Sequence, residues 1–157
     1  MSDTKVKDII STNKKAAFSY FIVNKYTAGV ILSGTEVKAV RTGKVSMSDS
    51  YCVFKNNELW VKNIHISEYK KGSHYNHEVK RARKLLLHRR ELRKLHSRVK
   101  EKGFAIVPTE VFISERNYIK ITIALVKGKK LFDKRHSIKE KDQKRELARE
   151  KTNRYLD

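Results

Sequence analysis

The 157-residue chain is strongly basic, with 37 Lys and Arg against 17 Asp and Glu and a formal net charge of +20. This length suits one domain with an arm, and an apolar content of 39% is enough for one modest core. The charge indicates a polyanionic partner, because cations that bind phosphates release counterions. An acidic membrane surface is the alternative, but the chain has no long apolar run and its basic segments lack a face rich in Trp and Phe.

Cysteine use and the first residues indicate the cellular compartment. Cys52 is the only cysteine and lies in an apolar run, which favours a small core residue over a reactive thiol. One thiol permits no intrachain disulfide, as is usual in a reducing cytoplasm. Residues 1–10 lack the apolar segment of a secretory signal, so we expect a cytoplasmic protein.

The first third of the chain predicts a flexible start, two strand segments and a short helix. Residues 1–12 are polar and are expected to form a flexible N-terminus. Residues 18–23 and 30–32 are rich in aromatic and β-branched residues, with Gly29 predicting a bulge or bend between them. The Ser33-x-x-Glu36 spacing predicts a capping box, and Gly43 ends the short helix that follows.

Two clusters of cations stand out. The short helix carries Lys38, Arg41 and Lys44 close together, for which dipole compensation and phosphate contact are equally open readings. Residues 80–102 hold eleven Lys and Arg against Glu91 and Glu101. Because apolar residues recur there every three or four positions, we predict one long amphipathic helix that contacts a polyanion and ends at Gly103.

The remaining segments predict further strands. Residues 49–55 and 58–66 predict a hairpin around Asn56-Asn57. Residues 104–107 and 111–113, split by Pro108, predict a further strand or a bulged pair, with the proline at an edge or bend. Residues 118–126 alternate with period two. The expected fold is mainly β with α: a small six-stranded antiparallel barrel, OB-like, with one short and one long helix.

Chemistry beyond binding finds little support in the sequence. There is no P-loop, no dinucleotide fingerprint and no H-E-x-x-H, and a nuclease would need clustered carboxylates for its metal ions. His65, His74 and His77 lack acidic or Cys partners at ligand spacing, so RNA contact or loop packing is preferred. We expect no enzyme, cofactor or metal. A general RNA chaperone or ribosomal-protein-like module and a metal-dependent nuclease remain as competing hypotheses.

The domain organisation follows from where packing signals stop. We expect an RNA-binding barrel over residues 13–132 and a basic tail over residues 133–157 that is disordered when free. From residue 137 onward, the aliphatic residues other than alanine are Ile138, Leu147 and Leu156. These are too few to bury a helix face.

Seven short motifs carry a family resemblance. In chain order they are Asn13-Lys14-Lys15-Ala16, Gly34-Thr35-Glu36-Val37-Lys38, Asp49-Ser50-Tyr51, His65-Ile66-Ser67-x-Tyr69, Arg83-Lys84-Leu85-Leu86-Leu87-His88, Lys127-Gly128-Lys129-Lys130, and Asp133-Lys134-Arg135 with Ile138-Lys139-Glu140. From about residue 13 to 140 the chain resembles the SmpB family, the SsrA-binding proteins.

The resemblance implies a bacterial ribosome-rescue factor with an antiparallel barrel related to the oligonucleotide-binding fold. Such a factor binds the tRNA-like domain of transfer-messenger RNA (tmRNA, SsrA) and delivers it to stalled ribosomes for trans-translation. The implied partners are tmRNA, the ribosome including small-subunit rRNA, and, through alanylated tmRNA, the elongation GTPase. Neither DNA nor a membrane is expected. The tail would occupy the decoding centre and the empty mRNA channel.

The resemblance and the two cationic clusters together assign the expected site residues. Expected to bind tmRNA, or to support that surface, are Asn13, Lys14, Lys15, Tyr20, Glu36, Lys38, Arg41, Lys44, Leu86, His88, Arg89, Arg90 and Lys120. Expected at the ribosome and its decoding centre are Gly128, Lys129, Lys130, Phe132, Asp133, Lys134, Arg135, Ile138, Lys139 and Glu140.

Three positions depart from the family pattern. Thr27 stands where many relatives have an acid, Val79 replaces a common proline, and Phe132 replaces the usual His or Tyr. Phe132 keeps a ring for stacking but loses a hydrogen-bonding edge.

Overall fold

The computed structural model describes residues 8–71, 76–129 and 131–154, the last segment with side chains from residue 135 to 152. Its elements in chain order are β1 (Asp8–Thr12), α1 (Lys14–Ser19), β2 (Tyr20–Val30), α2 (Gly34–Arg41), β3 (Val45–Ser46), β4 (Tyr51–Lys55), β5 (Glu58–Lys62), β6 (His65–Ile66), β7 (Arg83–Leu86), α3 (Arg89–Val99), β8 (Phe104–Ile113), β9 (Ile119–Gly128) and α4 (Leu131–Arg154).

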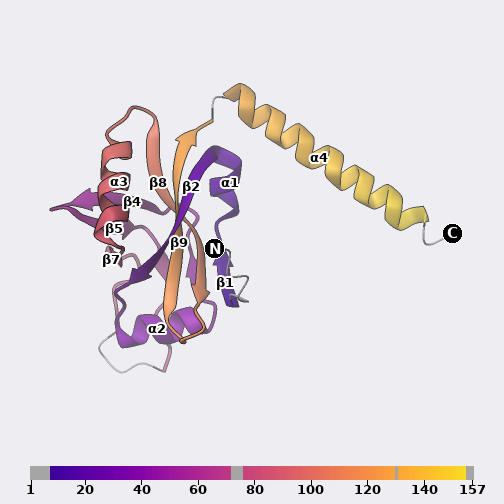
Figure 1. The fold of residues 1–157 in the computed structure, drawn as a ribbon. Helices are drawn as coiled ribbons and strands as arrows, with labels where there is room; N and C mark the ends of the chain where they lie inside the picture. The colour runs from indigo at the N-terminus through magenta and orange to yellow at the C-terminus, as the bar shows by residue number, and fades with distance from the viewer. Residues whose placement is uncertain (1–7, 72–75, 130, 155–157) are drawn as a thin grey trace.

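Six described strands close into a ring. They are hydrogen-bonded in the order β8-β4-β5-β7-β2-β9, and β9 pairs back with β8, every pairing being antiparallel. β1 lies outside this ring along β8, and β3 pairs with β6 in a small separate sheet. The predicted six-stranded antiparallel barrel is therefore confirmed (Figure 1).

Alternate side chains of the strands fill the barrel. Leu59, Ile123 and Leu125 have no exposed surface and belong to one core cluster, to which α2 adds Val40 and α3 adds Leu95. In Figure 1, α2 crosses the lower end of the barrel and α3 lies along its left side. α1 covers the outer face of β8 and β9 instead, where a second, smaller cluster joins residues of all three elements: Ala16, Val107, Ala124 and Val126.

The local turn and cap predictions hold. Asn56 and Asn57 have φ of 52° and 60°, so both adopt the left-handed conformation expected of the hairpin turn. α2 begins at a capping box, in which the Ser33 backbone N–H donates to Glu36 Oε1 at 3.2 Å. Pro108 lies where the register between β8 and β9 shifts. This irregularity agrees with the predicted bend, because proline has no N–H to donate to a neighbouring strand.

Two predictions for the N-terminal third are wrong. Residues 8–12 were expected to be flexible but form β1, because β8 extends beyond β4 and offers its main-chain groups to a further strand. Residues 14–19 form α1, where the sequence predicts a strand from residue 18. The helix forms because Asn13 caps it, its Oδ1 accepting from the backbone N–H of Ala16 at 3.2 Å.

Gly29 is not a bulge. β2 runs through it to Val30, and the irregularity in the pairing with β9 lies between Ile22 and Asn24. A Cβ at Gly29 would lie 3.3 Å from the Cβ of Leu86 on the neighbouring strand. The glycine therefore permits a close approach of β2 and β7 rather than a bend.

The single long helix predicted for residues 80–102 is also wrong. The segment divides into β7 and α3. Arg83 and Leu85 are both buried and point into the barrel, so the period that governs this segment is two and not 3.6. Because the inward-facing residue at position 83 is an arginine and not an apolar residue, the apolar pattern of the sequence does not show this alternation. The segment around Pro108, predicted as a further strand or a bulged pair, is one strand with its register shift at Pro108, whereas the predicted mate of β4 ends earlier, at Lys62.

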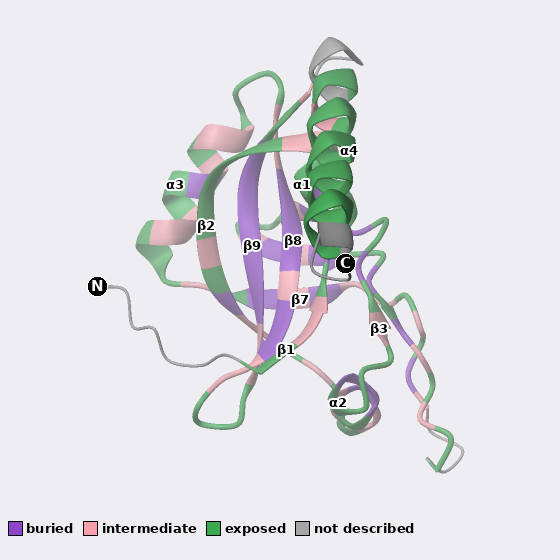
Figure 2. Ribbon diagram, turned by 90° about the vertical axis from the view of Figure 1, so that its right-hand side faces the viewer, coloured by how far each residue is buried: buried purple, intermediate pink, exposed green. Residues whose placement is uncertain are grey.

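The tail is helical in the structure. α4 leaves the upper end of β9 and projects away from the barrel (Figure 1), and Figure 2 shows most of its described part exposed. Its residues are mostly good helix formers, and the His136 Nδ1 atom lies 3.3 Å from Glu140 Oε1 on the next turn of the helix. No burial of an apolar face explains the helix, so its disorder in the free protein stays a prediction. Among the described helices, none combines the length and apolar content needed to cross a membrane.

We expect Leu95→Ala to destabilise the barrel by about 2–5 kcal/mol, the usual cost of truncating a fully buried leucine. Urea unfolding of the purified protein measures this loss. The neighbouring exposed Lys94→Ala is the matched control and should change stability by less than about 0.5 kcal/mol. Equal stability of the two variants would mean that α3 does not seal the core.

Candidate RNA-binding surfaces

A buried ion pair joins α2 to β7. Glu36 has no exposed surface, and its carboxylate accepts hydrogen bonds from Arg81 and from the equally buried Arg83. Burial alone would raise the pKa of Glu36, but the hydrogen bonds from Arg81, Arg83 and the Ser33 backbone lower it below its ordinary value. Glu36 is thus ionised inside the protein and supports the surface without reaching it.

Arg83 has its guanidinium fully used by the protein. Besides Glu36, it donates to the backbone oxygens of Ile64 at 2.9 Å and Val79 at 3.2 Å. These bonds fix the segments on either side of the 67–79 loop against β7. In the described residues, every buried side-chain nitrogen and oxygen has a partner. Neither Arg81 nor Arg83 was predicted as a site residue. They alternate with Leu85 at every second position, and a prediction of a strand over this segment would have placed Arg83 on the buried face with Leu85.

The cations of α2 gather at the lower end of the barrel. Arg41 donates to the side-chain and backbone oxygens of Asn117, both at 2.9 Å, which ties the helix to the β8–β9 turn. Lys38 places its Nζ 5.4 Å from the centre of the Tyr69 ring, and Lys44 is exposed after the helix. All three side chains remain accessible, so contact with phosphate is possible for each.

A row of paired residues crosses three strands beside this end. Lys120 of β9 pairs with Gly29 of β2, and Gly29 pairs with Leu86 of β7. Directly paired residues project from the same face of a sheet, and Leu86 is 50% exposed, so the row faces outward. We name Lys38, Arg41, Lys44, Leu86 and Lys120 the α2-end surface.

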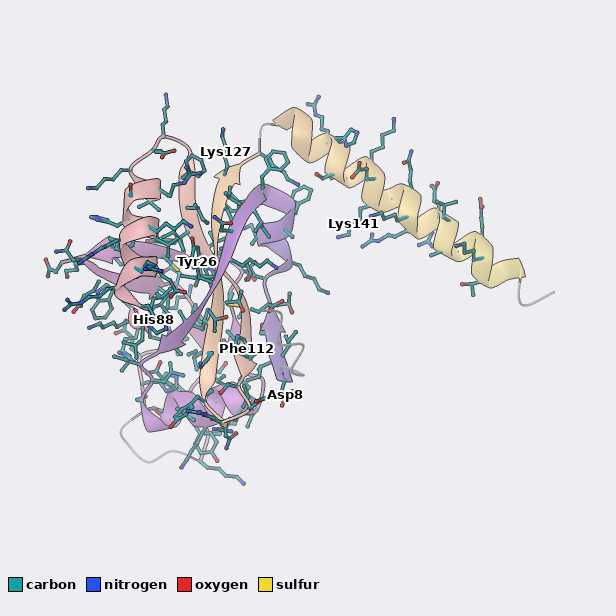
Figure 3. The ribbon with its side chains drawn as sticks, viewed as in Figure 1. Asp8, Tyr26, His88, Phe112, Lys127 and Lys141 are labelled. Carbon is teal, nitrogen blue, oxygen red and sulfur yellow. The ribbon has the colours of Figure 1, made fainter. Side chains whose placement is uncertain are left out.

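Three further predicted residues follow Leu86 closely. His88 is the N-cap residue of α3, where its backbone N–H donates to Glu91 at 3.3 Å, and Arg89 and Arg90 begin the helix. All three are exposed. Figure 3 shows His88 beside the lower end of α3. The turn from β7 into α3 therefore brings these cations next to the α2-end surface.

The predicted residues of α1 lie elsewhere. Lys14 and Lys15 are exposed on α1, and Tyr20 is half-buried where β2 begins. Asn13 is buried, and its Nδ2 donates to the backbone oxygens of Met47 at 3.2 Å and Pro108 at 2.9 Å. Asn13 is thus a buried structural cap whose side-chain amide donates both of its hydrogens within the protein.

The structure therefore separates the predicted tmRNA residues into two groups. Tyr20 and Gly29 are nine residues apart on β2, roughly 30 Å along a strand at about 3.3 Å per residue. The sequence assigned both groups to one RNA, and it gave no signal of this separation. A contact that includes both groups would have to extend along β2.

Lys129 fixes the junction between barrel and tail. Its backbone N–H donates to Ser19 at 3.1 Å, its Nζ donates to Ser137 Oγ at 2.9 Å, and the same Nζ lies 5.1 Å from the centre of the Phe21 ring. Gly128 is the last residue of β9. Lys130 lies outside the described residues, and the side chains of Phe132, Asp133 and Lys134 are likewise not described. The remaining predicted tail residues are exposed on α4: Arg135, Ile138, Lys139 and Glu140.

His77 and Cys52 have structural explanations. His77 is buried, with its Nε2 donating to the Ile66 carbonyl at 2.9 Å and its Nδ1 2.9 Å from Thr35 Oγ1, which is the loop packing considered above. His74 lies outside the described residues. Cys52 is buried as predicted, and burial raises the pKa of its thiol. Among the described residues, no three His, Cys, Asp or Glu side chains are grouped as a metal site.

Two of the departures from the family pattern are tolerated by the fold. Thr27 is exposed on β2, opposite Thr122 of β9. At position 79 the backbone carbonyl accepts hydrogen bonds from Arg83 and from the Ile66 backbone N–H. Valine and proline both have this carbonyl, so the replacement of the proline by Val79 keeps both bonds. Phe132 has no described side chain.

A small closed barrel with exposed cations on its outer surface and a basic helical extension defines a class of protein that binds structured nucleic acid. The chain belongs to the SmpB family. The family model described as "SmpB protein" matches residues 10–153.

Relatives of this chain cover nearly its whole length. The SsrA-binding protein of Cytophaga hutchinsonii is 56% identical over 144 residues, spanning 92% of this chain and 94% of the relative. Those of Phocaeicola vulgatus and Bacteroides thetaiotaomicron are 54% and 52% identical, each spanning 87% of this chain and 91% of the relative.

A solved structure is similar as well. Its chain, described in the words "tmRNA-SmpB: a journey to the center of the bacterial ribosome", is 43% identical with a TM-score of 0.65, over 77% of this chain and 85% of that one. This similarity in sequence and fold agrees with the family model.

We expect Glu36→Gln to destabilise the protein by about 3–5 kcal/mol at pH 7, because it leaves the buried Arg83 without its counter-charge. The folded pKa of Glu36 is lowered, so its stabilisation is present above the ordinary value near 4.5 and is lost as pH falls below it. Urea unfolding from pH 7 to pH 3 measures the difference between variant and parent, which should shrink on acidification.

The matched control is Glu58→Gln, which removes the surface pair with Lys84. A surface pair contributes about 0–1 kcal/mol, so this variant should remain close to the parent. A Glu36→Gln variant as stable as Glu58→Gln would contradict the role of the buried pair.

Proposed function

We propose that this protein binds the tRNA-like domain of tmRNA on its barrel and delivers it to stalled ribosomes for trans-translation. Its C-terminal tail occupies the decoding centre and the empty mRNA channel. The observation that carries the proposal is the agreement of relatives over nearly the full length of both chains, each described as an SsrA-binding protein, with the fold similarity to a chain of a tmRNA-SmpB structure.

The α2-end surface is the proposed tmRNA contact. Lys38, Arg41, Lys44 and Lys120 offer cations to phosphates, while Leu86 offers an exposed apolar side chain between them. Arg89 and Arg90 extend the positive surface onto α3. Recognition of a folded RNA by shape and phosphates needs such a surface on a rigid element, and the Glu36 ion pair supplies the rigidity.

The tail provides the ribosomal contact. From Lys127 onward the chain has twelve Lys and Arg against six acids. A segment with this composition is stabilised by a phosphate-lined channel, so its order would report that the mRNA channel is empty. The partners are then tmRNA, small-subunit rRNA and, through alanylated tmRNA, the elongation GTPase.

The protein acts by binding, not by catalysis, and its work on the ribosome implies a cytoplasmic location. A general RNA chaperone would bind many folded RNAs alike. A metal-dependent nuclease would consume RNA in magnesium but not with a chelator. Both hypotheses are tested by the binding measurement that follows.

We expect the purified protein to bind the tRNA-like domain of tmRNA in preference to an ordinary tRNA at physiological salt. Lys120→Ala should weaken this binding and reduce its salt dependence by about one unit of slope. Leu86→Ala should weaken it without changing the slope. The measurement is a titration at several salt concentrations, with input RNA checked for integrity in magnesium and in chelator.

Lys55→Ala, an exposed lysine on the β4–β5 hairpin, is the matched control and should bind as the parent does. Equal affinity for both RNAs, falling together with salt, would favour the chaperone hypothesis. RNA loss only in magnesium would favour the nuclease.

We expect truncation after Arg135 to abolish tagging of stalled translation products and to leave affinity for the tRNA-like domain unchanged. Among the removed residues, those that the structure describes lie on α4, and none of them belongs to either cluster of the barrel core. An in vitro translation assay on an mRNA without a stop codon measures tagging. Intact tagging by the truncated protein would sink the proposed role of the tail.

A further inference from the structure

Two adjoining hollows lie on the barrel: the first is lined by Lys15 and Ser19 of α1, and the second reaches Ser46, two residues after Lys44 of the α2-end surface. The first has a volume of about 340 Å³, and the second, of about 350 Å³, lies next to it. Ser48 and Asp49 line both, so the loop before β4 forms a ridge between them. Volumes of this size are in the range of small-molecule sites.

The first hollow has an apolar floor and aromatic side chains. Ala16 and Val107 are each only 3% exposed, and Tyr20 and Tyr51 also line it, Tyr51 being 42% exposed. The tyrosine rings come from the starts of β2 and β4, so their backbones are held by the barrel. An accessible ring over an apolar floor suits a planar group that stacks, such as a nucleobase.

The second hollow is polar and carries cations. It is lined by hydroxyls of Ser46 and Ser48, whose Oγ atoms lie 3.2 Å apart, and by His65 and Lys80, both exposed. The pairing of β3 with β6 sets Ser46 opposite His65. Hydroxyl, imidazole and ammonium donors in one hollow are the groups that proteins use to bind phosphate and sugar oxygens.

The ridge itself does not repel an anion. Lys15 of α1 places its Nζ 3.0 Å from Asp49 Oδ1, which offsets the charge of the carboxylate. Two motifs of the sequence, Asp49-Ser50-Tyr51 and the segment that begins at His65, contribute no residue to the α2-end surface, although Tyr69 of the second motif lies against Lys38. The fold brings both to this ridge.

We propose that the two hollows form a site for one unpaired nucleotide of an RNA, with the base stacked on Tyr51 and its phosphate held by Lys80 and His65. The site rests on the proposed function and extends it, because Ser46 of the second hollow comes two residues after Lys44 of the α2-end surface. The nucleotide belongs either to tmRNA or to ribosomal RNA, and both present the same chemistry.

The test uses the full chain in two arms, one with the tRNA-like domain of tmRNA and one with purified small ribosomal subunits. Tyr51→Ala should weaken binding by roughly 5- to 150-fold in one arm, the range expected for loss of base stacking. Tyr51→Phe keeps the ring and should remain within about twofold of the parent. Lys80→Ala should lower the salt slope in that same arm by about one, while Lys55→Ala leaves it unchanged.

Ultraviolet crosslinking in the same arm should join the peptide that contains Tyr51 to RNA, and the arm that responds identifies the source of the nucleotide. Unfolding midpoints of the variants check that the barrel is intact. Unchanged affinity of Tyr51→Ala in both arms would overturn the site, as would an equal loss for Tyr51→Phe. Lys120→Ala and Leu86→Ala, measured on the same tRNA-like domain, test the proposed function separately.

Discussion

The buried contact of Glu36 with Arg81 and Arg83 is the constraint on which the arrangement of the barrel surface depends. Burying these charges is costly, and only mutual pairing and complete hydrogen bonding offset that cost. In return the contact joins three segments that are distant in sequence: α2, β7 and the backbone around Ile64 and Val79. This contact helps to hold the cations of α2 and the exposed Leu86 relative to each other. An apolar replacement would fill the space but would lack the directional hydrogen bonds in which Oε1 of Glu36 accepts from Arg81 and Oε2 from Arg83.

The sequence predicts the barrel well wherever its pattern is apolar and local. The hairpin at Asn56-Asn57, the capping box of α2 and the alternation in β9 each carry a complete local signal. It fails where long-range contacts supply the stabilisation. From the sequence alone, Arg83 is predicted to be a surface cation, and only the structure shows that it is buried against Glu36. β1 and α1 depend on β8 and on the cap made by Asn13, neither of which a single segment reveals.

The candidate site was predictable in its charge but not in its layout. Cations such as Lys38, Lys120 and Arg89 were found from composition and resemblance. Which of these side chains lie next to one another is decided by the closure of the six strands into a barrel. The same closing sets the residues of α1 on a different part of the barrel from Lys120. A chain that binds one folded RNA and then a larger assembly needs two such surfaces, because the first remains occupied when the second is used. The separation along β2 supports two contacts of this kind.

The tail differs from the barrel in how its charge is distributed. At about 100° per residue, the cations of α4 point in all directions around the helix axis, and Figure 3 shows side chains on every side of it, among them Lys141. A helix that docks on a flat surface needs one stripe of contacts, whereas a helix enclosed by phosphates gains contacts on every side. Over its 24 residues α4 is about 36 Å long at 1.5 Å per residue. Its length and all-round charge therefore fit a channel better than a surface, and Lys129, bonded to both Ser19 and Ser137, sets the direction in which the helix leaves the barrel.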